Sequence, residues 1–159
     1  EDDFIDEDLS IRDYLKEIIL SFKETSDKEF ILNFEQDLNS IKIPKTIEII
    51  YGLRNFIGNA NKFSSKKVYI NLTTNKEFTE VIIEDDGNGF SSNILSKIGE
   101  PYLKNSKEAF KEKSGLGLGI FIGKTLLEKK FATILCRNSQ TRNGAEVIIK
   151  WNNKDLYNI

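Results

Sequence analysis

Residues 45–63 carry the strongest periodic pattern in the chain, and this pattern restricts the possible folds more than any other feature. Its apolar positions recur at a spacing that a rotation of about 100° per residue places on one side of a helix: Ile49, Leu53, Phe56 and Ala60. Pro44 stands just before the stretch and is typical of a helix start. We therefore predict a long helix over Lys45–Phe63 whose apolar side faces the core.

The remaining segments alternate between helix and strand. Ser10 is predicted to cap a first helix that runs to about Phe22, and further helices are expected over residues 94–98 and 117–130. Alternating apolar residues predict strands at five places: Phe30 to Phe34, Val68 to Leu72, Val81 to Ile83, Thr133 to Arg137 and Glu146 to Trp151. This order predicts an α/β (α+β) two-layer sandwich, in which a mixed, mostly antiparallel sheet is covered on one face by about three helices.

Composition excludes several classes of function. The net charge is −2 and the pI about 5.4, so the chain lacks the basic field with which proteins hold nucleic acid or an anionic membrane. No apolar run reaches the roughly 18 residues of a membrane span, and no signal peptide is visible. Cys136, the single cysteine, lies in an apolar run and is predicted to be a buried structural thiol.

Two residue types are missing from the chain. The absence of His excludes Ser-His triads, most zinc sites and a phosphoacceptor histidine within this chain. The absence of Met suggests an excised fragment of a longer protein. Residues 1–9 are predicted to be a linker and residues 10–159 to form one domain.

Polar residues form a second stripe on the long predicted helix. Asn55, Asn59 and Lys62 follow one another at i, i+4 and i+7, on a different side from the apolar residues. Asn does not favour a helix interior, so the stripe calls for a reason. An amide oxygen is a suitable ligand for Mg²⁺, and Lys suits a phosphate group. The alternative is an ordinary solvated face.

Two glycine-containing segments could approach a ligand closely. In the first, Asp85 ends an apolar strand and is followed by Gly87 and Gly89; a carboxylate there can accept a hydrogen bond from the exocyclic amine of adenine. An ordinary Asp-Gly turn is the alternative. In the second, Gly115–Gly119 runs directly into a predicted helix, whose free amides can bind phosphate. That segment matches neither a P-loop nor a Rossmann fingerprint.

Together these segments resemble, in order and spacing, the GHKL superfamily of ATP-binding domains, which includes DNA gyrase, Hsp90, MutL and the histidine kinases. Residues 53–63 are similar to its N box, 85–89 to its G1 box and 115–119 to its G2 box. Asn143-Gly144-Ala145 is similar to the third glycine motif. The resemblance covers residues 10–151 and implies the Bergerat fold.

The resemblance assigns roles to individual residues. It implies that Asn59 coordinates Mg²⁺, that Asp85 holds the adenine amine, that Lys62 reaches the phosphates and that Phe63 packs near the base. The phosphate chain would be cradled by the glycine segment: Gly115, Leu116, Gly117, Leu118 and Gly119. Residues 99–116 would form the ATP lid. Further ATP contacts are implied for Gly87, Gly89, Tyr102, Lys107 and Gly144, with Lys104 as the alternative lid cation.

One position separates the members of the superfamily. Hydrolysing members carry Glu four residues before the magnesium ligand, as a general base for water. This chain has Asn55 there, and an amide lacks useful basicity. The resemblance is therefore to a sensor histidine kinase, with Asn55 and Lys62 as the catalytic residues, and local phrases such as Gly99–Tyr102 resemble its RegB-like, redox-responsive branch. A GHKL ATPase, an anti-sigma-factor-type serine kinase and a docking domain without nucleotide remain as alternatives.

A histidine kinase assignment implies cofactors and partners. ATP and Mg²⁺ would be bound, and the γ-phosphate would go to a phosphoacceptor histidine on dimerisation helices upstream of the linker at residues 1–9. A cognate response regulator would then receive it. The isolated domain is expected to be monomeric and the parent protein dimeric. Its location would be the cytoplasmic end of a membrane-anchored sensor kinase, without nucleic acid or membrane contacts of its own.

Overall fold

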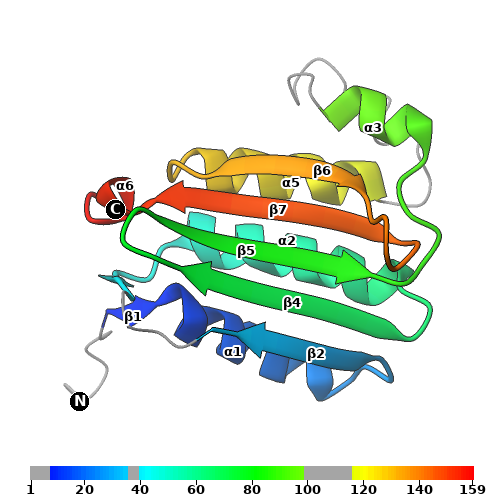
Figure 1. The fold of residues 1–159 in the computed structure, drawn as a ribbon, viewed down its shortest axis with the longest axis horizontal. Helices are drawn as coiled ribbons and strands as arrows, with labels where there is room; N and C mark the ends of the chain where they lie inside the picture. The colour runs from blue at the N-terminus through cyan, green and yellow to red at the C-terminus, as the bar shows by residue number, and fades with distance from the viewer. Residues whose placement is uncertain (1–7, 36–39, 99–115) are drawn as a thin grey trace.

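The structure of the chain is a computed structural model that describes residues 8–35, 40–98 and 116–159. Its centre is a five-stranded sheet with strand order β2-β4-β5-β7-β6 (Figure 1). The strands are β2 (Glu29–Phe34), β4 (Lys67–Thr74), β5 (Phe78–Asp85), β6 (Thr133–Asn138) and β7 (Ala145–Asn152). Only the β2–β4 pair is parallel, and the other three pairs are antiparallel. The predicted mixed, mostly antiparallel sheet is confirmed.

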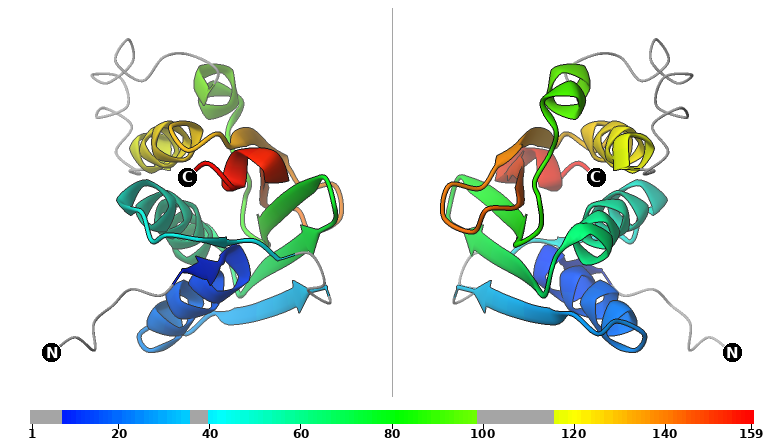
Figure 2. Two further views of the ribbon diagram at one scale, coloured as in Figure 1. Left: turned by 90° about the vertical axis from the view of Figure 1, so that its left-hand side faces the viewer. Right: turned by 90° about the vertical axis from the view of Figure 1, so that its right-hand side faces the viewer.

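Three helices cover one face of this sheet, and the opposite face carries none of them (Figure 2). They are α1 (Ile11–Lys23), α2 (Ile47–Phe63) and α5 (Leu116–Glu128). Smaller elements complete the fold: α3 (Ser92–Ile98), α6 (Asn153–Leu156), and the two-residue strands β1 (Leu9–Ser10) and β3 (Lys42–Ile43), which pair with each other. The predicted two-layer sandwich is therefore confirmed. Among the described helices, none is long and apolar enough to cross a membrane.

The helix starts depend on capping side chains. Ser10 caps α1 as predicted: its Oγ accepts a hydrogen bond from the Asp13 amide at 3.3 Å, and the Asp13 carboxylate accepts one from the Ser10 amide at 3.4 Å. The prediction for α2 was two residues too long, because Thr46 is its N-cap and accepts a hydrogen bond from the Ile49 amide at 3.2 Å.

The two-residue period of the strands decides which side chains face the helices. On β5, Val81, Ile83 and Asp85 point to the same face, and the two apolar members are buried beneath the helices. Val68 of β4 lies opposite Asp85, and Val147 of β7 lies opposite Ile83. Asp85 therefore extends a core-facing row, and this register places a carboxylate under the helix layer.

Two glycines allow α2 and α5 to pack closely. A Cβ atom at Gly52 would lie 2.5 Å from the Cγ atom of buried Leu127, and one at Gly123 would lie 2.8 Å from the Phe56 ring. Since Gly52 and Phe56 belong to α2, and Gly123 and Leu127 to α5, each helix inserts a large side chain over a glycine of the other. Because the two helices are antiparallel, the end of α2 lies beside the start of α5.

Substitutions at two glycines of α2 test this packing. We expect Gly52→Ala to lower the free energy of unfolding, because overpacking of about 1–3 kcal/mol exceeds a helix-propensity gain of about 1 kcal/mol. Gly58→Ala is the matched control, since its Cβ would lie at an ordinary 3.4 Å from the Phe22 ring. We expect Gly58→Ala to stabilise the domain. Urea denaturation of both variants measures the difference, and equal effects would contradict the packing argument.

Candidate functional site

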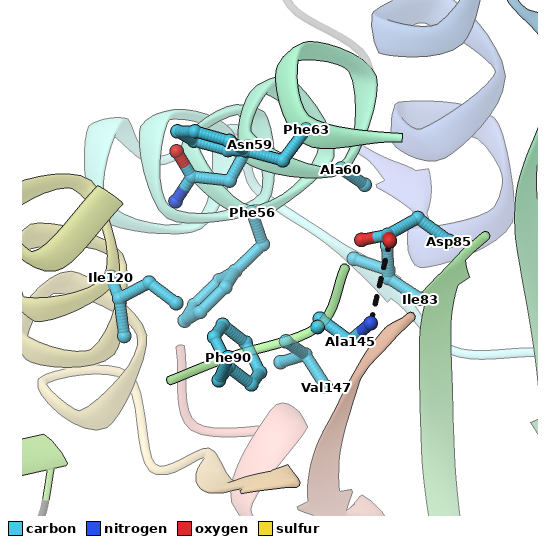
Figure 3. A pocket seen from close by; sticks show the side chains of 11 residues that line it. Phe56, Asn59, Ala60, Phe63, Ile83, Asp85, Phe90, Ile120, Ala145 and Val147 are labelled. Carbon is cyan, nitrogen blue, oxygen red and sulfur yellow. Dashed lines mark hydrogen bonds between the residues drawn. The ribbon is translucent and has the colours of Figure 1, made fainter. Parts of the chain in front are cut away.

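A pocket opens where the end of α2, the start of α5, the end of β5 and the start of β7 meet (Figure 3). It contains about 380 Å³ of space not filled by atoms, including its open mouth. Four residues that the sequence singled out line it: Asn59, Phe63, Asp85 and Gly89. The two polar residues that the resemblance assigned to metal and base, Asn59 and Asp85, thus share one cavity.

The other lining residues are apolar and come from α2, β5, the loop after β5, α5 and β7. They are Phe56, Ala60, Ile83, Phe90, Ile120, Ala145 and Val147. The sequence analysis did not identify them as site residues. A weak signal existed for two of them, since Ile83 precedes Asp85 by one strand period and Phe90 follows Gly89 directly. Flat, apolar walls with a few polar groups are suited to an aromatic ring system.

Asp85 is the buried polar group of the pocket, with 4% of its surface exposed. Its Oδ1 accepts hydrogen bonds from the amides of Gly87 at 2.8 Å and Ala145 at 3.3 Å. Figure 3 shows the other oxygen turned toward the side of the pocket on which Asn59 and Phe63 lie. The backbone bonds therefore hold the carboxylate in one orientation and leave one of its edges facing the cavity.

Burial raises the pKa of the Asp85 carboxyl above its usual value of 3.8. The two amide hydrogen bonds oppose this increase, the neighbouring charge of Asp86 adds to it, and the positive charge of Lys28 reduces it. Ionised Asp85 is thus held in place against a desolvation cost. A buried carboxylate with a raised pKa in a cleft is typical of a functional group.

Three glycines near Asp85 stand where a side chain has no room or where the backbone conformation favours glycine. A Cβ atom on Gly87 would collide with the Phe63 carbonyl oxygen, and one on Gly144 would collide with the Asp85 carbonyl oxygen. Gly89 has a φ of +78°, which favours glycine. The predicted importance of these glycines therefore has a steric explanation for all three.

Asn138, at the end of β6, fixes the loop that follows Asp85 and was missed by the sequence analysis. Its Oδ1 accepts a hydrogen bond from the Phe90 amide at 2.7 Å, and its Nδ2 donates one to the Phe90 carbonyl at 3.1 Å. This pair of bonds places Phe90 against the pocket. No local motif marks Asn138, because its partner lies 48 residues earlier in the chain.

Asp86 joins the segment that follows α2 to the sheet. Its Oδ1 accepts hydrogen bonds from the amides of Ser65 at 2.8 Å, Lys66 at 3.0 Å and Lys67 at 3.1 Å. Burial works to raise the pKa of the Asp86 carboxyl, but the amides of Lys66, Lys67 and Ser65 together outweigh it and lower the pKa below 3.8. Adjacent carboxylates in one turn thus have opposite pKa shifts.

The lowered pKa of Asp86 predicts a pH-dependent contribution to stability. Because the folded pKa lies below the unfolded value near 3.8, ionised Asp86 stabilises the fold above that value, and the contribution is lost as pH falls through the folded pKa. We expect Asp86→Asn to lower the free energy of unfolding at pH 7 by about 1–2 kcal/mol, and the difference from the unsubstituted domain to shrink below about pH 4. Denaturant unfolding between pH 3 and 7 measures this, with the exposed Asp27→Asn as control. A pH-independent difference would contradict the assignment.

Asn59 points into the pocket and lacks a full set of hydrogen bonds. Its Nδ2 atom is buried and has no partner among the residues that the structure describes. A Cβ atom on Gly119 would lie 3.0 Å from both amide atoms of Asn59, so the side chain lies directly against the first turns of α5. Buried polar atoms normally have partners, so an unpaired amide group on a residue that lines the pocket is consistent with a ligand site.

Asn55 and Lys62 do not line the pocket, although their spacing placed them on one stripe with Asn59. The Asn55 Nδ2 donates a hydrogen bond to the Tyr51 carbonyl at 2.7 Å. The Lys62 ammonium group lies over the Phe63 ring, 5.2 Å from its centroid, and Phe63 is one of the residues that line the pocket. The catalytic roles assigned to Asn55 and Lys62 remain predictions.

Several predicted site residues lie outside the described part of the chain. These are Tyr102, Lys107, Lys104 and Gly115, together with nearly all of the predicted lid at residues 99–116. Leu116, Gly117 and Leu118 belong to the first turn of α5, which begins one residue earlier than predicted. Cys136 is partly buried on β6, and burial raises the pKa of its thiol to about 12, in agreement with a structural thiol.

Comparison with known proteins identifies the fold and the family. The family described as histidine kinase-, DNA gyrase B-, and HSP90-like ATPase matches residues 45–155. The chain is similar in structure to the mycobacterial sensor histidine kinase MprB, with a TM-score of 0.69 and 18% identity over 93% of this chain and 97% of that one. It is also similar to the catalytic domain of histidine kinase ThkA, with a TM-score of 0.72 and 18% identity over 91% and 93% of the two chains.

Curated relatives are much longer than this chain. Sensor histidine kinase RegB of Cereibacter sphaeroides is 35% identical over 97 residues, which are 58% of this chain and 21% of RegB. Heme sensor protein HssS of Staphylococcus saprophyticus is 30% identical over 132 residues, 81% of this chain and 28% of HssS. The matches thus span about a fifth to a quarter of these relatives' lengths. Its similarities in sequence and in fold are to sensor histidine kinases, and the chain belongs to the family of histidine kinase-, DNA gyrase B- and HSP90-like ATPases.

Proposed function

We propose that this domain binds Mg-ATP in the pocket between α2, α5 and the sheet, and transfers the γ-phosphate to a histidine on a separate phosphoacceptor domain of the same sensor kinase. The observation that carries the proposal is the single cavity shared by Asn59 and Asp85, with apolar walls between them. The family membership of the chain supports it.

The pocket offers complementary groups for a purine. The Asp85 carboxylate accepts the hydrogen bond of the exocyclic amine, and its own backbone bonds keep it in position for this. Phe56, Phe63 and Phe90 supply ring surfaces on which a flat base packs. Guanine presents a carbonyl oxygen where adenine presents its amine, so this arrangement favours adenine.

The residues at the pocket also fit a magnesium ion delivered with the nucleotide. The Asn59 amide oxygen is a hard ligand of the kind that Mg²⁺ prefers. Within residues 8–35, 40–98 and 116–159, no group of three or more His, Cys, Asp or Glu side chains is placed to hold a metal. A bound Mg²⁺ would neutralise phosphate charge, and most of its remaining ligands would be phosphate oxygens and water. We therefore expect Mg²⁺ to bind far more weakly without nucleotide than with it.

The phosphate end of the site rests on residues whose roles follow from the family resemblance. Lys62 would reach the phosphates and Asn55 would act at the reacting end. The backbone of the segment from Gly115 to Gly119 would cradle the phosphate chain, with Gly144 beneath Asp85 and with Tyr102 and Lys107 contributing from the lid. In the transfer step, the bond between the γ-phosphorus and the ADP oxygen breaks as a bond to the acceptor imidazole nitrogen forms.

The wider setting follows from the same assignment. The phosphoacceptor histidine has to come from another domain, since this chain contains none, and the phosphoryl group would pass from it to a cognate response regulator. We propose that the parent protein is a dimeric, membrane-anchored sensor kinase whose catalytic end is cytoplasmic.

Titration with a fluorescent ATP analogue tests the binding half of the proposal. We expect saturable binding that Mg²⁺ strengthens, and we expect Asn59→Ala to remove the strengthening by Mg²⁺. The isolated domain should release negligible phosphate from ATP. When a phosphoacceptor histidine domain and ATP labelled in the γ-phosphate are added, the label should appear on that domain. A signal that neither Asp85→Asn nor Asn59→Ala changes would indicate a docking domain without nucleotide.

The main alternative is a GHKL ATPase or an anti-sigma-factor-type serine kinase that acts as a nucleotide-dependent switch. Asn55 argues against the hydrolysing alternative, because an amide is no general base for water, and its Nδ2 is engaged with the Tyr51 carbonyl. Rapid phosphate release by the isolated domain would favour that alternative over the histidine kinase.

A further inference from the structure

Lys28 lies outside every motif of the family resemblance, in the turn between α1 and β2, yet its side chain reaches the end of α2. Its ammonium group donates hydrogen bonds to the Asn61 carbonyl at 2.9 Å, the Ser64 carbonyl at 2.7 Å and the Ser64 hydroxyl at 3.1 Å. The same turn adds Ser26, whose hydroxyl accepts from the Lys28 amide at 3.0 Å and bonds to the Asn61 side chain at 2.5 Å. The α1–β2 turn is thus tied to α2 by several bonds.

These contacts are made where a cation is most effective. The last carbonyls of a helix have no partner within the helix and form the negative end of its dipole. The Lys28 ammonium supplies both hydrogen bonds and positive charge at this end. The last turn of α2, which Lys28 holds, begins at Asn59 and ends at Phe63, and both residues line the pocket. The position of Lys28 therefore bears on where these two side chains lie.

The chain just beyond α2 is held by a charge of opposite sign. Asp86 accepts hydrogen bonds from the amides of Ser65, Lys66 and Lys67, while Lys28 binds the carbonyls that precede them. A cation on the carbonyls and an anion on the amides together secure the junction between α2 and the sheet. Asp86 adjoins Asp85, so this junction connects the two polar groups of the pocket.

We propose that Lys28 is a positioning residue of the nucleotide site, which holds the last turn of α2 so that Asn59 and Phe63 face Asp85 across the pocket. This inference rests on the proposed function. A second effect accompanies the geometric one: the charged groups that act on Asp85 are Asp86, which raises its pKa, and Lys28, which lowers it. Lys28 thereby also favours the ionised carboxylate that accepts from adenine.

Removal of the Lys28 charge tests both effects. Lys28→Gln keeps a hydrogen-bond donor without the charge, Lys28→Met removes both, and Lys66→Met is the control because it removes one exposed lysine charge from the neighbouring turn. The readouts are affinity for a fluorescent ATP analogue between pH 5 and 8, and titration of the Asp85 carboxyl carbon by NMR in the nucleotide-free protein. Far-UV circular dichroism verifies folding, and Lys28→Gln serves if Lys28→Met does not fold.

We expect Lys28→Met to weaken nucleotide affinity by at least about tenfold, which corresponds to about 1.4 kcal/mol. The pH midpoints of Asp85 titration and of binding should both move upward in Lys28→Met and Lys28→Gln, and Lys28→Arg should restore them. Behaviour identical to that of Lys66→Met would overturn the proposal, and so would a weaker affinity with unmoved midpoints in all variants. If the unsubstituted domain binds no nucleotide, the proposed function itself fails, while the Asp85 titration still decides whether Lys28 acts on Asp85.

Discussion

Asp85→Asn is expected to weaken ATP binding by about 10- to 100-fold while leaving the nucleotide-free domain as stable as before or more stable. A hydrogen bond to a charged group contributes about 1.5–3 kcal/mol, and each 1.4 kcal/mol is a factor of ten in affinity. In Asp85→Asn an amide replaces the carboxylate. When its Oδ1 keeps the bonds to the backbone amides, its NH2 group faces the purine, where the adenine amine is also a donor. Both the charge and the acceptor pattern are lost.

Stability is expected to change in the opposite direction because Asp85 is ionised at a cost. Its pKa is raised above 3.8, chiefly by burial, so the folded state holds the proton more tightly than the unfolded state. The stability associated with the protonated form is present below about pH 3.8 and is lost as pH rises through the folded pKa. Asn avoids this loss, and its Oδ1 can still accept from the amides of Gly87 and Ala145.

The neighbouring carboxylate provides the matched control. Asp86→Asn removes the same charge from the same turn but weakens three amide bonds, so it should reduce stability at pH 7 where Asp85→Asn does not. Thermal unfolding at pH 7 without nucleotide, followed by titration with the ATP analogue, measures both properties in each variant. Tight nucleotide binding by Asp85→Asn, or a clear loss of stability in it, would contradict the role assigned to this buried carboxylate.

The parts of the site that sequence reasoning found are those in which the residue type is itself the signal. Asp85 ends a strand whose period of two predicts its face, and Gly87 and Gly144 mark places where a side chain has no room. Asn59 stood out because amides are unfavourable in helix interiors. In each case a local rule is broken for a reason that the pocket explains.

The parts that it missed depend on partners distant in sequence. Asn138 binds the backbone of Phe90 across 48 residues, and Lys28 binds backbone carbonyls 33 and 36 residues away. Backbone groups are the same at every position, so no residue pattern marks them as partners.

Asn55 was misplaced for a different reason. Helical spacing placed it beside Asn59, but its side chain adopts a rotamer that bonds to the Tyr51 carbonyl, and spacing alone does not determine a rotamer. The start of α2 differed because the capping side chain of Thr46, rather than Pro44, ends the non-helical backbone.

The second large effect is expected for Gly144, in the turn between β6 and β7. A Cβ atom there would collide with the carbonyl oxygen of Asp85, and backbone cannot move aside as a flexible side chain does. We expect Gly144→Ala to lower the free energy of unfolding by about 2–3 kcal/mol. Nucleotide affinity should fall as well, because the strand start at Ala145 supplies one of the amides that orient Asp85.

Asn143, the residue before Gly144, provides the control. If the turn were sensitive to any substitution, a change at Asn143 would also destabilise the domain, whereas the steric explanation predicts that it does not. Asn143 has a φ of +68°, a backbone conformation that glycine adopts more readily than Asn. We expect Asn143→Gly to leave stability unchanged or to raise it by up to about 1 kcal/mol, and to leave nucleotide affinity unaffected. Urea denaturation and ATP-analogue titration of both variants measure these effects. If Gly144→Ala had the same stability and the same nucleotide affinity as the unsubstituted domain, a Cβ atom would fit at this position. That result would contradict the predicted collision with the Asp85 carbonyl oxygen.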